Sequence, residues 1–143
     1  MIKILFVCHG NICRSPMAEF VLKDMVRRAG AVDRFEIASA AVSSEELGNP
    51  VYPPARREMQ RHGIACDGHK ARKITRADYE HFDRIYYMDS SNARYLARLF
   101  PDDRGKIRPL LSRDVADPYY CGNFSRTWED VNEGCERILK EFL

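Results

Sequence analysis

Hydrophobic and polar positions follow two different patterns at the start of the chain. The run from Ile2 to Val7 is mostly apolar, rich in β-branched residues and free of Gly and Pro, which is typical of a buried strand in a parallel sheet. Beyond position 15, apolar residues recur at helical spacing up to Gly30, with Ser15 as the expected cap and Pro16 at the first helical position. The segment is therefore predicted to form a strand, a tight loop and a helix.

The same alternation of strand and helix patterns continues to the end of the chain. Further strands are predicted over 35–38, 83–88 and 106–109, and further helices over 55–62, 90–99 (with Ser90 as its cap) and 128–142. Two stretches, 39–54 and 114–124, have loop and turn composition. We expect one domain over residues 1–143 with an α/β fold. It has an open four-stranded parallel sheet, helices on both faces, and ligands bound beyond the carboxyl ends of the strands.

Composition narrows the classes of protein that fit. The chain has 143 residues, of which 45% are hydrophobic and 31% charged, so it can bury a core without disulfides or metal. A net charge of +2 is too balanced to indicate nucleic-acid binding. No apolar run approaches the roughly 20 residues of a membrane span. The five cysteines are an odd number, which fits free thiols in a reducing compartment. We expect a cytoplasmic monomer without membrane or nucleic-acid partners.

The segment between the first strand and the first helix carries the candidate chemistry. A loop at this place presents backbone N–H groups and the positive end of a helix dipole to one point, which favours a phosphate group and also a thiolate. Arg14 supplies a planar fork for two phosphate oxygens, and Ser15 can donate its hydroxyl to the sulfur of Cys8. The candidate phosphate-binding residues are Cys8, His9, Gly10, Asn11, Ile12, Cys13, Arg14 and Ser15.

Other interpretations of this loop are weaker. A cysteine at the end of a strand is often only a small buried residue, and a lone arginine is usually solvated, but their combination here is harder to explain that way. The GxxxxGK[ST] and GxGxxG patterns of nucleotide-binding loops are absent. Zinc binding by Cys8, His9 and Cys13 is not favoured, because no second Cys/His pair follows at a suitable spacing.

At these residues the chain resembles the low-molecular-weight protein-tyrosine phosphatase family, over nearly its whole length. The family's loop, Cys followed by five residues and Arg-Ser directly after the first strand, matches Cys8 to Ser15, and its late Asp-Pro pair matches Asp117-Pro118. Further matches are Ser39-Ala40, Gly48-Asn49-Pro50, Arg61-His62-Gly63-Ile64 and Met88-Asp89. The loop and the Asp-Pro pair at opposite ends of so short a chain make the resemblance specific.

The resemblance implies a reaction in two steps on tyrosine-phosphorylated proteins, without metal or cofactor. Cys8 would form a phosphocysteine that water then hydrolyses, and Asp117 would act first as general acid and then as general base. Asn11 would shape the loop with support from Ser39 and His62. The simpler interpretations are an ordinary turn carboxylate for Asp117 and a helix-end histidine for His62.

The walls of the expected pocket differ from those of many relatives. Tyr119 and Tyr120 are predicted to line it, although they could also be surface aromatics or phosphorylation sites. Where many relatives have an aromatic wall, this chain has Glu45, with Leu47 the nearest apolar candidate and Tyr52 a possible substitute. Glu45 and its neighbour Glu46 either disfavour acidic phosphopeptides by repulsion or form a solvated loop face.

Three alternatives are less favoured, because the chain lacks the cysteine pair of one, has Ile12 in the loop and has both Cys8 and Asp117; the state of Cys13 stays open. Arsenate reductases of this fold use a distal cysteine pair that residues 83–99 do not contain, and arginine phosphatases typically have Thr in place of Ile12. A phosphotyrosine-binding module would need only the N–H cradle and Arg14. A reversible Cys8–Cys13 disulfide, as in relatives, would protect the nucleophile, whereas the simpler interpretation of Cys13 is a packed thiol.

Overall fold

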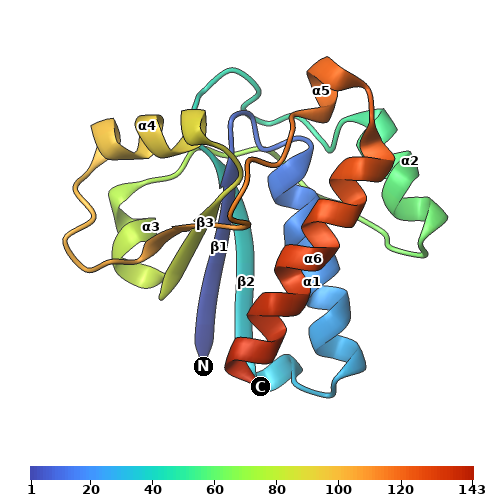
Figure 1. Ribbon diagram of the computed structural model, residues 1–143, viewed down its shortest axis with the longest axis horizontal. Helices are drawn as coiled ribbons and strands as arrows, with labels where there is room; N and C mark the ends of the chain where they lie inside the picture. Colours follow the sequence, from blue (N-terminus) through green and yellow to red (C-terminus); the bar gives the residue numbers. More distant parts are fainter.

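The computed structural model describes residues 1–143 and is built on a four-stranded sheet in which all strands run parallel (Figure 1). The strands are β1 (Ile2–Cys8), β2 (Phe35–Ala41), β3 (Arg84–Tyr87) and β4 (Ile107–Pro109), in the spatial order β2-β1-β3-β4. The predicted open parallel sheet is confirmed. Because β1 pairs with both β2 and β3, the segment that follows Cys8 leaves from the middle of the sheet.

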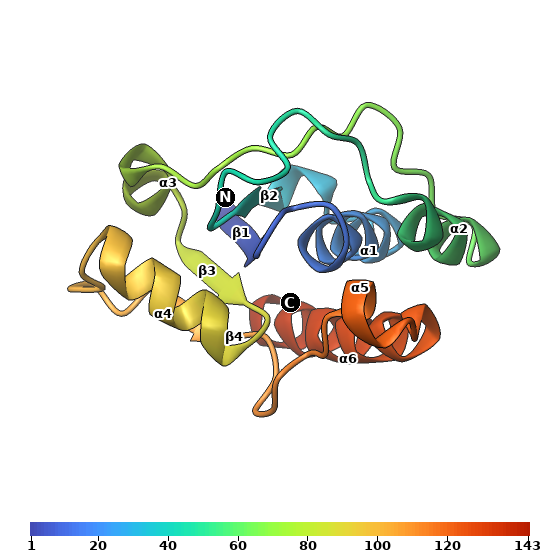
Figure 2. The same ribbon diagram turned by 90° about the horizontal axis from the view of Figure 1, so that it is seen from above.

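Helices cover both faces of the sheet (Figure 2). The helices α1 (Arg14–Arg28), α2 (Pro53–Arg61) and α6 (Phe124–Phe142) lie on one side, and α3 (Arg76–His81) and α4 (Ser90–Leu99) lie on the other. A 3₁₀ turn, η1 (Val32–Arg34), precedes β2, and the short helix α5 (Pro118–Cys121) precedes α6. No helix is long and apolar enough to cross a membrane.

The central strand β1 shows why its sequence is apolar without a break. Ile4 and Phe6 belong to the core on the side of α1 and α6, whereas Leu5 and Val7 belong to the core on the side of α3 and α4. All four side chains are fully buried. A strand covered on both faces buries every side chain in turn, so it needs apolar residues at successive positions rather than at alternate ones.

Several predicted boundaries are wrong for identifiable reasons. The second strand continues past Ala38 to Ala41, because its last residues pair with the end of β1 at Cys8. The helix α4 is capped by the carboxylate of Asp89 rather than by Ser90, which is its first helical residue. The helices α3 and α5 were not predicted. Both are short, of 6 and 4 residues, and lack enough turns for a periodic apolar pattern.

The parallel arrangement brings four loops to one end of the molecule. Cys8, Ala41, Tyr87 and Pro109 end the four strands at the same edge, which is the upper end of the sheet in Figure 1, and the two chain termini lie at the opposite end. The order β2-β1-β3-β4 places consecutive connections on opposite sides of β1, where open α/β sheets have their binding crevice. The candidate site is formed by the segments that follow these strands.

Candidate active site

The loop that follows β1 is held by the segment that follows β2. The backbone N–H of Val42 donates to the carbonyl of Cys8, and that of Ser43 donates to the carbonyl of His9. The Ser43 hydroxyl donates to the same His9 carbonyl at 2.9 Å. The path of the loop therefore continues the pairing of β1 with β2 before it turns into α1, and the base of the loop is fixed.

Asn11 determines the turn of this loop. It is the one residue other than glycine with a positive φ, 62°, in the left-handed region that asparagine tolerates better than most residues. Its side-chain amide donates to the hydroxyls of Ser15 (2.8 Å) and Ser39 (3.0 Å), and its Oδ1 accepts from the backbone of Arg72 (3.2 Å). Asn11 is fully buried, so it shapes the loop from beneath instead of lining its concave side.

His69, and not His62, contacts Asn11. The Nε2 atom of His69 lies 2.8 Å from the carbonyl oxygen of Asn11, which can only accept, so the ring donates. His62 follows α2, where its ring stacks on Trp128 with centroids 3.9 Å apart and bonds to Glu58. The prediction that His62 supports the loop is wrong, because the helix end before Gly63 lies against α6.

The sulfur of Cys8 lies at the base of the loop, close to two donors from the start of α1. The Oγ atom of Ser15 is 3.0 Å from Sγ, and the backbone N–H of Ser15 is 3.4 Å from it. Ser15 is not the cap of the helix as predicted, because α1 begins two residues earlier than expected, at Arg14, with Cys13 as its N-cap. Its hydroxyl is thereby free to contact the sulfur, and both groups are buried.

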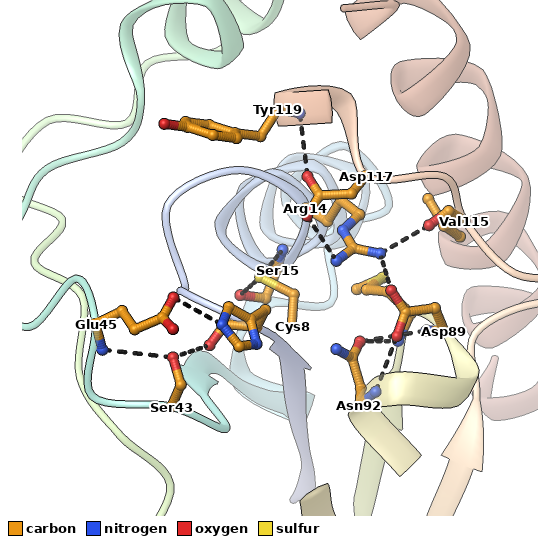
Figure 3. Close-up of polar contacts among 12 residues, drawn as sticks. Cys8, Arg14, Ser15, Ser43, Glu45, Asp89, Asn92, Val115, Asp117 and Tyr119 are labelled. Atoms are coloured by element: carbon orange, nitrogen blue, oxygen red, sulfur yellow. Dashed lines mark hydrogen bonds and ion pairs between the residues drawn. The ribbon is translucent and has the colours of Figure 1, made fainter. Parts of the chain in front are cut away.

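Arg14 is buried and held in a fixed orientation. Its Nη1 atom donates to Asp89 Oδ2 and to the carbonyl of Val115, both at 2.7 Å, and its Nη2 atom lies 3.4 Å from Asp117 Oδ2 (Figure 3). Burial alone would lower the pKa of this guanidinium, but the negative charges of Cys8, Asp89 and Asp117 raise its pKa above the ordinary value. The cation is therefore permanent and points toward the loop.

Asp89 was not singled out as a site residue from the sequence. In the sequence, Met88-Asp89 is only a motif match, and nothing local indicates that its carboxylate contacts Arg14, 75 positions earlier. Because Asp89 follows β3 and Arg14 follows the loop after β1, the adjacent parallel strands bring the two together. The usable signal was a carboxylate directly after a predicted strand.

Asp117 reaches the same point from the far end of the chain. Its Oδ1 atom accepts from the backbone N–H of Tyr119 at 3.0 Å, which caps α5, while Oδ2 faces Arg14. The Pro118 ring starts α5 and cannot donate, so the Asp-Pro pair fixes both the helix start and the direction of the carboxylate. The side chain of Asp117 is 26% exposed, at the mouth of the site.

These groups surround a pocket of about 200 Å³ at the carboxyl edge of the sheet. It is lined by Cys8, His9, Gly10, Ile12, Cys13, Arg14, Glu45, Glu46, Asp117, Tyr119 and Tyr120. The prediction that Leu47 is a wall is wrong, because Leu47 does not line the pocket and is 54% exposed. Tyr52 contributes indirectly, since its ring packs against that of Tyr119 with centroids 5.3 Å apart.

The cysteines and the remaining polar groups add no metal site. No group of three or more His, Cys, Asp and Glu side chains is arranged to hold a metal ion. Cys13 is buried, and this burial, together with the charge of Cys8, raises the pKa of its thiol. Cys13 is a free thiol in this structure, and the disulfide with Cys8 stays a prediction.

The arrangement is suited to one kind of ligand. The loop backbone at the start of α1, a buried guanidinium and a sulfur at the base line one pocket, and a carboxyl group stands at its mouth. Backbone N–H groups at a helix start and a guanidinium favour a tetrahedral oxyanion. A phosphate monoester in this pocket would have its phosphorus next to Cys8 and its ester oxygen toward Asp117. The fold and the site therefore define the class of cysteine-based phosphatases.

Comparison with known proteins gives the family. The sequence model described as "Low molecular weight phosphotyrosine protein phosphatase" matches residues 3–143. YfkJ of Bacillus subtilis, a low molecular weight protein-tyrosine-phosphatase, is 37% identical over 97% of this chain and 94% of its own. The phosphatase of that family from Gallus gallus is 42% identical over 98% of this chain and 92% of its own. The chain belongs to this family, whose members are cysteine-dependent and metal-independent enzymes.

Solved structures agree with this assignment. The crystal structure of YfkJ superposes with a TM-score of 0.95 at 36% identity, covering 99% of this chain and 94% of that one. The drosophila arginine phosphatase DARP superposes with a TM-score of 0.88 at 32% identity, covering 99% of this chain and 98% of that one. Relatives with this fold are thus named for two different phosphorylated amino acids. The fold alone does not identify the substrate, which depends on the residues of the pocket.

Proposed function

We propose that this chain is a protein-tyrosine phosphatase that uses Cys8 as nucleophile, Arg14 as phosphate ligand and Asp117 as general acid and base. The observation that carries the proposal is the convergence of these three side chains on one pocket from loops after β1 and β4. The identity to named tyrosine phosphatases, 37% and 42%, supports the substrate. Ile12, an apolar side chain lining the pocket, suits a phenyl ring rather than a guanidinium.

In the first step the thiolate of Cys8 attacks phosphorus in line with the ester oxygen. The S–P bond forms as the P–O bond to tyrosine breaks, and Asp117 gives its proton to the departing phenolic oxygen. The loop N–H groups and Arg14 stabilise the charge on the three non-bridging oxygens. Asp89 Oδ2 and the Val115 carbonyl accept from Arg14, and they hold its fork in the plane that the oxygens require.

In the second step water replaces tyrosine on the opposite side of phosphorus from the sulfur. Asp117, now ionised, accepts a proton from this water as its oxygen attacks, and the S–P bond breaks to release inorganic phosphate and the Cys8 thiolate. The Ser15 hydroxyl, 3.0 Å from Sγ, donates to the sulfur as it regains negative charge. No other group needs to be added for the protons and electrons to balance.

The test is hydrolysis of a phosphotyrosine peptide in the presence of a chelator, beside phosphoserine and phosphoarginine peptides. We expect turnover of phosphotyrosine by the wild type, no turnover by Cys8→Ser, and a kcat reduced by about 10²–10⁴-fold in Asp117→Asn. Cys121→Ser, which alters an exposed thiol outside the pocket, is the matched control and should retain full activity.

Two results would redirect the assignment. Binding of the phosphotyrosine peptide without any turnover by the wild type would make the chain a binding module. Turnover restricted to phosphoarginine would move the substrate to the class named for DARP.

A further inference from the structure

Two neighbouring carboxylates form one rim of the pocket. Glu45 and Glu46, which we call the acidic lip, lie in the loop after β2, and both line the pocket that contains Cys8. Tyr119 of α5 lies on another side of the same mouth from Glu45 (Figure 3), and Tyr120 also lines the pocket. A peptide whose phosphorylated side chain enters the pocket must therefore pass its flanking residues over the lip.

Glu45 is fixed by contacts to the catalytic loop itself. Its Oε2 atom accepts from His9 Nε2 at 2.8 Å, and its backbone N–H lies 3.4 Å from the Ser43 hydroxyl. The ring of His9 in turn packs on the ring of Tyr95 in a T-shaped arrangement, with centroids 5.5 Å apart. The carboxylate is thus held beside the pocket, and its 68% exposure leaves it accessible to a ligand.

Glu46 is held against the loop at a second point. Its Oε2 atom accepts from the Asn49 side chain at 2.6 Å. A Cβ atom at Gly10 would lie 3.1 Å from Glu46 Cγ, so the stem of this side chain packs directly on the loop backbone. The two acids are therefore held in place at the rim by specific contacts. Acids that only formed a solvated loop face would not need such contacts.

The charges around the mouth are predominantly negative. Glu45 and Glu46 line the pocket, and the one arginine among the lining residues, Arg14, is only 2% exposed and already paired with Asp89. No lysine lines the pocket. Once a phosphate group occupies the loop and neutralises Arg14, the flanking part of a substrate meets the lip without a compensating exposed arginine or lysine among the lining residues.

We propose that the acidic lip selects phosphotyrosine sequences that carry Lys or Arg within about two residues of the phosphotyrosine. This inference rests on the proposed function and specifies its substrate class. A carboxylate and a solvated unit charge about 6 Å apart interact enough to change kcat/KM by about threefold. Attraction of a basic flank and repulsion of an acidic one then separate the two peptides by about tenfold.

The experiment measures kcat/KM for three phosphotyrosine peptides that differ only in having two Lys, two Ala or two Glu beside the phosphotyrosine. The wild type is compared with Glu45→Gln/Glu46→Gln. The control is Glu129→Gln/Glu136→Gln, which changes the net charge equally at two exposed positions outside the pocket. Each protein is assayed at about 20 mM and 300 mM salt, because solvated charge pairs are screened over about 10 Å at 0.1 M.

We expect the wild type and the control to prefer the Lys peptide to the Glu peptide by about tenfold at low salt. The preference should fall below about threefold in the lip variant and should shrink for the wild type at high salt. Equal rates for all peptides in the wild type, or a preference unchanged in the lip variant, would overturn the inference while leaving the tyrosine phosphatase intact. Absence of turnover for all three peptides would instead overturn the proposed function together with this inference.

Discussion

The ion pair between Arg14 and Asp89 gives the sharpest test of how the fold positions the site. Asp89 has two functions that can be separated, because Oδ1 caps α4 by accepting from the Asn92 backbone at 2.8 Å while Oδ2 accepts from Arg14 at 2.7 Å. Asparagine caps helices about as well as aspartate and keeps a neutral acceptor, whereas alanine removes both contacts. The pair Asp89→Asn and Asp89→Ala therefore distinguishes the charge from the cap.

The expected magnitudes follow from burial. Breaking a fully buried ion pair costs about 3–5 kcal/mol, but Asp89 is 19% exposed and Arg14 keeps the Val115 carbonyl and Asp117 as neighbours. We therefore expect a loss of about 1–2 kcal/mol in the free energy of unfolding for Asp89→Asn. In Asp89→Ala, loss of the helix cap adds about 1 kcal/mol, and loss of the acceptor that Asn would have kept for Arg14 adds about 1 kcal/mol more. The free energy of unfolding of Asp89→Ala should therefore fall by about 3–4 kcal/mol.

Urea unfolding measures these losses, and kcat/KM on a phosphotyrosine peptide measures their effect on the site. Both variants should show a lower kcat/KM, because the fork of Arg14 is less firmly held. Asp114→Asn is the matched control, since it removes one negative charge at a solvent-exposed contact with Ser90 and should change stability by less than about 0.5 kcal/mol. Equal stability of Asp89→Asn and the wild type would refute the argument that the charge of Asp89 holds Arg14.

Three further predictions test the packing and the loop. His69→Ala should lower kcat/KM and reduce the free energy of unfolding by about 1–3 kcal/mol, because it leaves the Asn11 carbonyl without its partner. His62→Ala should lower stability without changing kcat/KM, since His62 packs on Trp128. An equal loss of kcat/KM in both variants would contradict this. Gly134→Ala should cost about 1–3 kcal/mol in urea unfolding, because its Cβ would overlap Leu110 Cγ, and an unchanged midpoint would show that Leu110 moves freely. Burial raises the pKa of the Cys135 thiol far above its ordinary 9.0, so above about pH 9 the unfolded chain loses a proton that the folded chain keeps. The free energy of unfolding of the wild type should therefore fall above about pH 9, and this fall should be smaller by about 1.4 kcal/mol per pH unit in Cys135→Ala. Cys121→Ala, which alters an exposed thiol, is the control and should follow the wild type.

Sequence alone determined the layout of the fold where local patterns are strong. The apolar run of β1, the helical spacing after Pro16 and the repeated alternation predicted an open parallel sheet, because burial on both faces imposes those patterns directly. The spacing of Cys8, Arg14 and Ser15 also lies within one continuous turn from strand to helix. Their proximity to one another is therefore a local property of the chain.

Contacts between distant segments were decided by the tertiary structure. His62 and His69 are seven residues apart and chemically alike, yet only the path of the chain after α2 brings His69 to Asn11 and leaves His62 on Trp128. The contact of Asp89 with Arg14 depends on β3 lying next to β1, which no local pattern specifies. In the same way, only the folded loop places Leu47 outside the pocket and both carboxylates of the acidic lip on its rim. Local propensity fixes elements and short motifs, whereas the partners of a buried charge depend on which strands become neighbours.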